Sequence, residues 1–276
     1  MILREAQNYK NYKEFFSYFE LLGVTMQLTF LGTGTAAPLF GRRPSSILLK
    51  KGDFTGLLDI GSGAVHSLAA TNVDPINLNA LFISHFHSDH SADMIMLLHS
   101  NSATPEKIRT APLKIYGPQG LRTFVDGILK LFPETEPETY FLDLKENPQN
   151  EKIISNMKVD CFRTEHTVNS IGYRFRINEF DFVYTGDCAF SMELIRSCTG
   201  ADMMITECSY ADRKATADHL TPAYAAELAK KAGVKDLIII HRYPQTLEED
   251  VEHEISSIYS GNLFFPQDGQ MISFGE

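Results

Sequence analysis

The sequence lacks the features of a membrane or secreted protein. No stretch reaches the ~18 uncharged apolar residues that a membrane helix needs, and charged residues occupy the N-terminal segment where a secretory signal would be apolar. The four cysteines, Cys161, Cys188, Cys198 and Cys208, show neither CxxC spacing nor a disulfide framework. These absences predict a protein of a reducing, cytoplasmic setting.

The sequence also has fewer positively charged than negatively charged residues. The chain has 25 Lys and Arg residues against 35 Asp and Glu residues, a formal net charge of −10. A uniformly acidic surface repels phosphate backbones, so extended nucleic-acid binding is disfavoured. Bound metal ions can reverse the sign of charge inside a cleft, which leaves a small phosphate-bearing substrate open. With 276 residues, 43% of them hydrophobic, the chain can bury a sizeable core, and a homodimer is compatible with this composition.

Residues 1–25 differ from the rest of the chain. Their apolar residues have some helical spacing, which stops at Gly23, and the following MQLTFLGTGTAAP is typical of the first strand of a domain. We expect residues 1–25 to form an N-terminal extension, either helical or upstream of a start at Met26, and residues 26–276 to form the main domain. That domain should mix strands and helices. The predicted strands are 27–31, 46–49, 56–60, 78–84, 113–116, 159–163, 171–177, 180–184, 203–206 and 237–240, and the predicted helices are 91–100, 118–131 and one between Thr221-Pro222 and Gly233.

Polar side chains follow the ends of four predicted strands. His85, Asp187, Glu207 and His241 each come at or just after the carboxyl end of an apolar run. Open α/β sheets bind ligands just outside the carboxyl ends of their strands. The pattern therefore predicts one site built from segments that are distant in the sequence.

The segment SHFHSDHSAD, residues 84–93, gives the strongest local signal for a metal site. It places His85, His87, Asp89 and His90 within six residues. In an extended chain, residues i and i+2 point to the same side, so His85 and His87 can bind one ion while Asp89 and His90 face a second. A single histidine would favour a solvated loop, but this combination after a buried strand favours zinc, with iron or manganese as alternatives.

The pattern His-x-His-x-Asp-His after a strand resembles the signature of the metallo-β-lactamase fold, and the resemblance runs from Met26 to the C-terminus. Asp59 in LLDIGSG matches the first motif of that family, His166 in TEHT the third, Asp187 in YTGDC the fourth and His241 in IIIHRYP the last. The resemblance implies an α/β (α+β) fold, a four-layer αββα sandwich. It also implies that Asp59 supports the metal-binding loop without being a ligand.

The same resemblance implies two divalent metal ions. Each ion would have three ligands of its own, and one aspartate would bridge the two ions. The first ion would be held by His85, His87 and His166, the second by Asp89, His90 and His241, and both by Asp187. Asp89 would also orient the attacking water.

Several segments resemble the ribonuclease Z-like branch of this fold: FLGTGTAAP, ITECSY, DHLT and FPQDGQMISF. In that branch a Glu–His pair assists proton transfer, and Glu207 and His219 occupy its positions. Two departures argue against tRNA processing. The long arm that clamps tRNA is absent, since only short spacers separate His166, Asp187 and Glu207, and the last motif reads HRYP.

The sequence thus predicts a dinuclear metal-dependent hydrolase, a phosphodiesterase acting on a small or cyclic nucleotide-like phosphodiester. Asp89, Glu207 and His219 would be its catalytic residues. Hydrolysis of another ester, a thioester or a lactone is the first alternative; RNA processing and a non-catalytic metal-binding sensor are others. Arginines near the motifs could grip phosphate or be solvated surface residues, and the sequence leaves this open for Arg42, Arg43 and Arg242. The remaining histidines are expected to be structural or on the surface: His66, His99 and His253.

Overall fold

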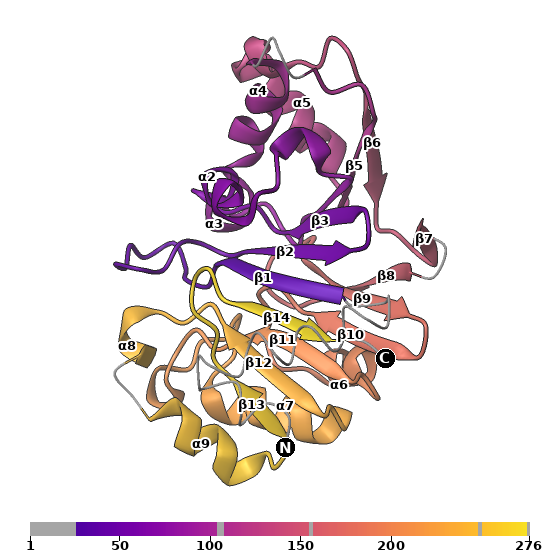
Figure 1. Cartoon of the computed structure of the whole chain (residues 1–276). Helices are drawn as coiled ribbons and strands as arrows, with labels where there is room; N and C mark the ends of the chain where they lie inside the picture. The colour runs from indigo at the N-terminus through magenta and orange to yellow at the C-terminus, as the bar shows by residue number, and fades with distance from the viewer. Residues whose placement is uncertain (1–25, 104–107, 155–156, 248–249, 275–276) are drawn as a thin grey trace.

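Two seven-stranded sheets form the centre of the protein in the computed structural model, which describes residues 26–103, 108–154, 157–247 and 250–274 (Figure 1). The predicted N-terminal extension, residues 1–25, lies outside this range. The first sheet has the order β14 (Met271–Phe274), β1 (Met26–Gly32), β2 (Ser46–Lys51), β3 (Phe54–Leu58), β4 (Ala80–Phe82), β5 (Leu113–Gly117), β6 (Leu142–Glu146). The second has the order β13 (Asn262–Phe264), β12 (Asp236–Ile240), β11 (Met203–Glu207), β10 (Phe180–Tyr184), β9 (Ile171–Ile177), β8 (Met157–Arg163), β7 (Glu151–Ile154).

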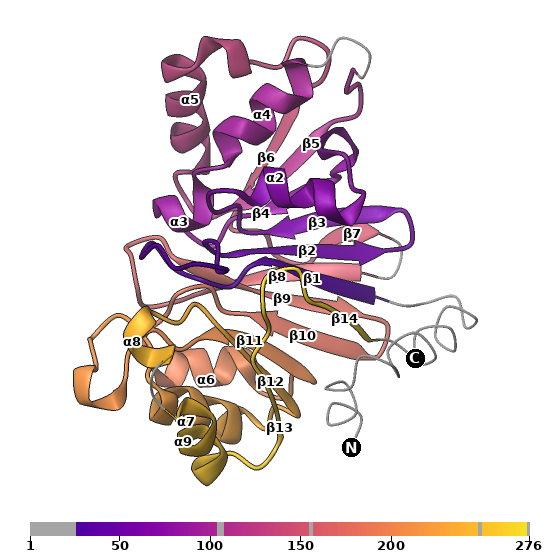
Figure 2. The same ribbon diagram turned by 60° about the vertical axis from the view of Figure 1, so that its left-hand side comes forward.

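Helices cover the outer face of each sheet (Figures 1 and 2). On the first sheet these are α2 (Ala64–Leu68), α3 (Ser88–Ser91), α4 (Met94–Ala103) and α5 (Leu121–Leu131). On the second they are α6 (Met192–Cys198), α7 (Pro222–Ala232) and α9 (Val251–Ile258), with α8 (Pro244–Leu247) near the edge.

Three apolar clusters separate the four layers. The central cluster joins the facing sides of the two sheets and includes Phe82 and Phe175, whose rings meet edge to face 5.0 Å apart. The other two lie between each sheet and its helices, around Leu81 and around Ile239. Each fully buried side chain of this size contributes about 1.5–3 kcal/mol. The four-layer αββα sandwich expected from the sequence is confirmed.

The burial of each strand follows its place in the sandwich. In β8, buried and more exposed residues alternate, because only one face of this strand is covered. β11 is buried along its whole length and β12 almost so. One face of these strands packs against the first sheet, and α7 and α9 cover the other face. These continuous apolar runs, MMITE and DLIII, are typical of parallel strands enclosed on both sides.

Parallel pairing brings several strand ends to one edge. β3, β4 and β5 are mutually parallel in the first sheet, and β10, β11 and β12 in the second. Their carboxyl ends therefore face the same edge of each sheet, and the chain leaves them at Asp59, His85, Asp187, Glu207 and His241. Two of these residues, Asp59 (φ 54°) and His241 (φ 50°), adopt the left-handed conformation directly after their strands.

Some predicted elements differ from the structure at their ends. The helix predicted over 118–131 begins only at Leu121, because Gly120 before it is left-handed (φ 96°). The strand predicted over 78–84 is shorter, 80–82, since the Arg109 guanidinium takes the carbonyl of Leu78. The strands β7, β13 and β14 and the helices α6, α8 and α9 were not predicted. β13 pairs with β12 and β14 with β1, so the last described segment crosses from one sheet to the other.

No helix within the described ranges is long and apolar enough to cross a membrane. All four cysteines are buried free thiols.

Candidate metal centre

The loop after β4 places His85 with a free ring nitrogen facing the cleft. Ser84 donates its hydroxyl hydrogen to Asp59 (Oγ to Oδ2, 2.7 Å), so its oxygen accepts from Nδ1 of His85, 3.0 Å away. Nδ1 therefore carries the ring proton and Nε2 keeps its lone pair. That Nε2 is buried and has no hydrogen-bond partner, which is an unfavourable state for a polar atom unless a cation binds there.

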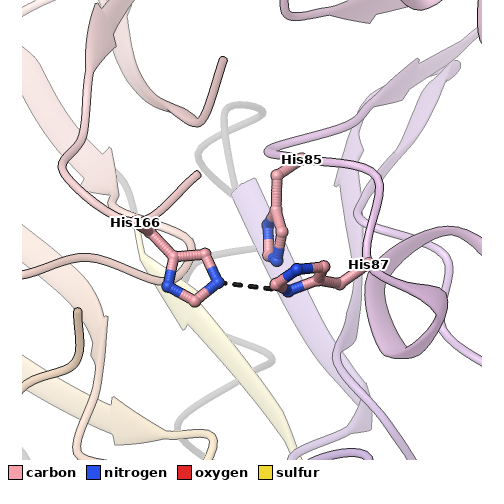
Figure 3. A group of neighbouring side chains, drawn as sticks. All are labelled: His85, His87 and His166. Carbon is pink, nitrogen blue, oxygen red and sulfur yellow. Dashed lines mark hydrogen bonds between the residues drawn. The ribbon is translucent and has the colours of Figure 1, made fainter. Parts of the chain in front are cut away.

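His87 and His166 complete a group of three imidazoles around this nitrogen (Figure 3). The Nδ1 of His87 lies 3.1 Å from the Nε2 of His166. The other nitrogen of His166, Nδ1, lies 3.0 Å from the backbone oxygen of Asp218 and so must donate to it. One nitrogen from each of the three rings lies within 4.8 Å of the others, a spacing that could hold a metal ion.

A second group is formed by Asp89, His90 and His241. Nδ1 of His90 lies 2.7 Å from Asp59 Oδ2, and Nδ1 of His241 lies 3.0 Å from Ser209 Oγ. These contacts turn the two Nε2 atoms toward each other, 3.2 Å apart, with Asp89 Oδ2 3.3 Å from that of His241. A polar partner on the far nitrogen of each imidazole is the usual arrangement around metal ligands.

Asp187 stands between the two groups. Its Oδ2 lies 3.9 Å from Nε2 of His85 and 3.8 Å from that of His166, both of the first group. On the side of the second group, Oδ1 lies 3.3 Å from His90 and Oδ2 3.5 Å from His241. A carboxylate at this position can contact ions on both sides.

The electrostatics of the centre suit cations. Burial opposes ionisation of Asp187, but His241 and His90 outweigh it and hold the pKa of that carboxyl well below its usual range. Burial, reinforced by the neighbouring His90, lowers the pKa of His85, so its imidazole stays neutral. Burial disfavours the charged form of His90, but Asp187 and Asp59 outweigh it and raise the pKa of this imidazole; a bound ion would take the place of its ring proton. Imidazoles and ionised carboxylates are the donors that divalent transition metals prefer. The residues present therefore fit a divalent metal centre.

Glu207 and His219 lie beside the two groups. Oε1 of Glu207, the last residue of β11, lies 2.8 Å from Nδ1 of His219 and also accepts from the backbone N–H of Cys188 at 2.8 Å. His219 stands just before α7 and its Nδ1 is 4.0 Å from Asp187 Oδ2. Burial disfavours the charged imidazole, yet the hydrogen bond and charge of Glu207 raise the pKa of His219 to about 9.

The structure therefore brings all the predicted site residues together and adds others that sequence reasoning missed. Tyr210 and Tyr243 stack on each other with ring centroids 5.0 Å apart. Tyr210 also meets the ring of His219 edge to face, and Tyr243 meets that of His241 in the same way. Tyr184 donates to Asp59 at 2.5 Å, and Ser209 contacts His241. Their place in or beside the ITECSY, HRYP and YTGDC motifs was the available signal. His66, His99 and His253 belong to neither group.

The sandwich and its grouped imidazoles and carboxylates define a metallo-hydrolase of the metallo-β-lactamase fold. Residues 26–259 match the family described as Anti-Pycsar protein Apyc1, and the chain belongs to that family. Ribonuclease Z of Thermococcus sibiricus is 27% identical over 91% of this chain and 97% of its own length. A Bacillus subtilis protein named Probable metallo-hydrolase YhfI is 26% identical over 88% of this chain and 98% of its own.

Solved structures have the same fold. The crystal structure of the metallo-β-lactamase fold protein YhfI from Bacillus subtilis matches with a TM-score of 0.77 and 24% identity, covering 91% of this chain and 100% of that one. The short form of human tRNase Z matches with a TM-score of 0.75, also at 24% identity and with the same coverage. The ribonuclease Z-like resemblance seen in the sequence is confirmed.

Proposed function

We propose that the chain is a dinuclear metal-dependent phosphodiesterase acting on a small or cyclic nucleotide-like phosphodiester. The observation that carries the proposal is the Glu207–His219 pair, held at 2.8 Å beside the shared Asp187. It supplies a proton donor next to two ligand groups, which is the combination that hydrolysis of an ester with a poor leaving group requires.

Seven residues would hold the two ions: His85, His87 and His166 the first, Asp89, His90 and His241 the second, and Asp187 both. Two bound divalent ions would lower the pKa of a water molecule and neutralise charge on the attacking and leaving oxygens of a phosphodiester. Zinc suits this donor set, and manganese or iron would also be accepted by it. Asp89 would also orient the attacking water, since its Oδ2 lies in the second group, 3.3 Å from Nε2 of His241.

His219 would donate the proton to the leaving oxygen. Its raised pKa keeps the imidazole protonated at neutral pH, and Glu207 fixes the ring by accepting from Nδ1. This leaves Nε2–H as the donor toward the substrate. Glu207 is itself held by the backbone N–H groups of Cys188 and Ser209, so the pair is oriented before substrate binds.

Several observations favour a phosphodiester over other esters. Relatives named Ribonuclease Z act on RNA, whose backbone is a phosphodiester, and a two-ion site suits the same bond here. The net charge of −10 and the short spacers between His166, Asp187 and Glu207 favour a small substrate over a folded RNA. RNA, thioester, lactone and carboxylic ester substrates are therefore the comparison panel.

The decisive experiment is the leaving-group dependence of His219→Ala. We expect turnover of a nucleoside 3′,5′-cyclic phosphate to fall by about 10²–10⁴ with both ions retained, because the alkoxide needs a proton. Turnover of bis(4-nitrophenyl) phosphate should fall much less, since nitrophenolate leaves without one. His253→Ala, an exposed histidine on α9, is the matched control.

Three outcomes would contradict the proposal. Equal losses on both substrates would remove the proton-donor role. Loss of an ion from the variant would make His219 a ligand. Its ring lies close enough to the ligand atoms of His166 and Asp187 for the three to hold an ion. A metal-loaded wild type that hydrolyses a thioester or lactone but no phosphodiester, or that hydrolyses nothing, would assign the centre to the alternative enzymes or to a sensor.

A further inference from the structure

Two arginines that belong to neither ligand group, Arg42 and Arg242, lie against one short segment of the chain. Nη1 of Arg42 donates to Thr33 Oγ1 at 2.8 Å and to the backbone oxygen of Pro266 at 3.4 Å. The guanidinium of Arg242 lies over the ring of Phe265, 4.8 Å from its centroid. Because Phe265 and Pro266 are consecutive residues after β13, both cations lie against the same short segment.

Within the part of the chain that the structure describes, Arg242 is a half-buried cation without an anionic partner. It makes no ion pair and no hydrogen bond with any described residue, and its ring contact with Phe265 leaves the edge of the guanidinium free. Burial and then the charge of Arg42 lower the pKa of Arg242 to about 10. Nη2 and Nε of Arg42 also donate to no described residue. Two partly desolvated like charges are unfavourable unless an anion joins them.

Burial lowers the pKa of Arg42 and the charge of Asp268 opposes this effect. The oxygens of Asp268 already accept from the backbone N–H and hydroxyl of Thr33 and from the backbone N–H of Arg43. Arg43 adds a third cation, 3.7 Å from Asp268. Arg42 and Arg43 thus share one committed carboxylate, and Arg242 pairs with none within the described residues.

The pair is tied to the metal centre through the backbone. Arg242 directly follows His241, and the backbone N–H of His241 donates to the oxygen of Thr33 at 2.9 Å, the residue that Arg42 contacts. Gly32 allows this packing, since a Cβ there would lie 1.9 Å from the oxygen of Pro44. The backbone near both arginines is therefore linked to the second ligand group, to which neither side chain belongs.

We propose that Arg42 and Arg242 form an oxyanion subsite that binds a phosphate group other than the scissile phosphodiester. The planar fork of each guanidinium matches phosphate oxygens, and a phosphate between the two cancels their repulsion. The phosphate has two sources, a phosphomonoester elsewhere on the substrate or free inorganic phosphate. The first source rests on the proposed function, and the second does not.

The substrate arm compares two chromogenic phosphodiesters that differ by one phosphomonoester. They are thymidine 5′-(4-nitrophenyl phosphate) and the same compound carrying a 3′-phosphate. The wild type should prefer the second, and Arg42→Gln and Arg242→Gln should each reduce the ratio of the two kcat/KM values by about tenfold to a hundredfold. Arg242→Lys keeps the charge without the fork and should restore part of the ratio. Arg196→Gln, an exposed arginine paired with Glu193 on α6, is the control.

In the free-phosphate arm, the metal-loaded wild type and the same variants are titrated with inorganic phosphate in a calorimeter, which gives the affinity for phosphate. Weaker phosphate binding in both glutamine variants, with metal content and melting temperature unchanged, supports the subsite whatever the substrate. If neither ratio nor phosphate affinity changes in either variant, the proposal is wrong. If the wild type hydrolyses neither phosphodiester, the proposed function fails, while the titration still decides the subsite.

Discussion

The two halves of the sandwich contribute to the metal centre in different ways. The first half supplies four of the seven candidate ligands from one loop after β4, within six residues of the sequence. The second half supplies His166, Asp187 and His241 from three separate loops. A single loop sets its ligands by local backbone geometry, an extended stretch followed by α3. The other set depends on how the strands that precede these ligands, β8, β10 and β12, are placed in their sheet.

This difference has an energetic counterpart. The loop of the first half is fixed by Asp59, which contacts Ser84, His90 and Tyr184 with one carboxylate. Within the described residues of the second half, the ligating imidazoles have separate partners: Ser209 Oγ lies at Nδ1 of His241 and the backbone oxygen of Asp218 at Nδ1 of His166. The two halves meet at Asp187, so changes there should have the largest effect.

Asp187→Ala should give the largest loss. Because its carboxylate contacts both groups, the variant is expected to bind both ions more than about 100-fold more weakly and to lose turnover with them. Elemental analysis after dialysis against a chelator measures the metal content. Asp160→Asn, in a surface pair with Arg176, controls for loss of a carboxylate. Two ions retained in Asp187→Ala would show that the halves bind independently.

Glu207→Gln should have the next largest effect, about tenfold on turnover of a poor leaving group. Glu207 and His219 both belong to the second half, so this substitution tests whether that half alone supplies the proton donor. A protonated His219 is required, so the rate falls as pH rises through its pKa, which Glu207 raises to about 9 from 6.5. Bound cations act in the opposite direction, so the limb should lie between these two values. The variant should lose activity at lower pH than the wild type. An alkaline limb unmoved by the substitution would belong to another group.

Asp59→Asn and Ser209→Ala compare the supports of the two halves directly. Removing a polar partner of a ligating histidine typically weakens metal binding by about 10–100-fold. Asp59→Asn should lie near the upper value, because three side chains depend on it, and Ser209→Ala near the lower one. Competition with a chelator of known affinity measures both. The reverse order would show that the loop of the first half keeps its shape without Asp59.

Removal of residues 1–25 should have the smallest effect. Every candidate ligand lies downstream of the strand that begins at Met26, so metal content and turnover are expected to stay within experimental error of the full chain. Reduced solubility alone would not contradict this. Loss of bound metal would place the segment in the core of the domain.

The same contrast explains what the sequence could predict. The His85–His90 loop is visible in one short motif, and Asp187, Glu207 and His241 are visible as polar residues that end apolar strands. Tyr210 and Tyr243 could not be predicted in this way, because they meet only after two loops fold together. The strands β13 and β14 were missed for a related reason: their short apolar runs gain a partner only from distant strands, β12 and β1.

Asp59 and His241 both adopt the left-handed conformation, so at these two positions the backbone and the metal centre favour different amino acids. This conformation costs a residue with a side chain on the order of 1 kcal/mol, and glycine or asparagine adopts it most readily. A library selected for thermal stability alone would favour those two amino acids at position 241, whereas at position 59 the loss of the contacts with Ser84, His90 and Tyr184 would oppose them. One selected for turnover would keep aspartate and histidine. Sequencing both pools would show at which positions stability and metal binding favour different amino acids.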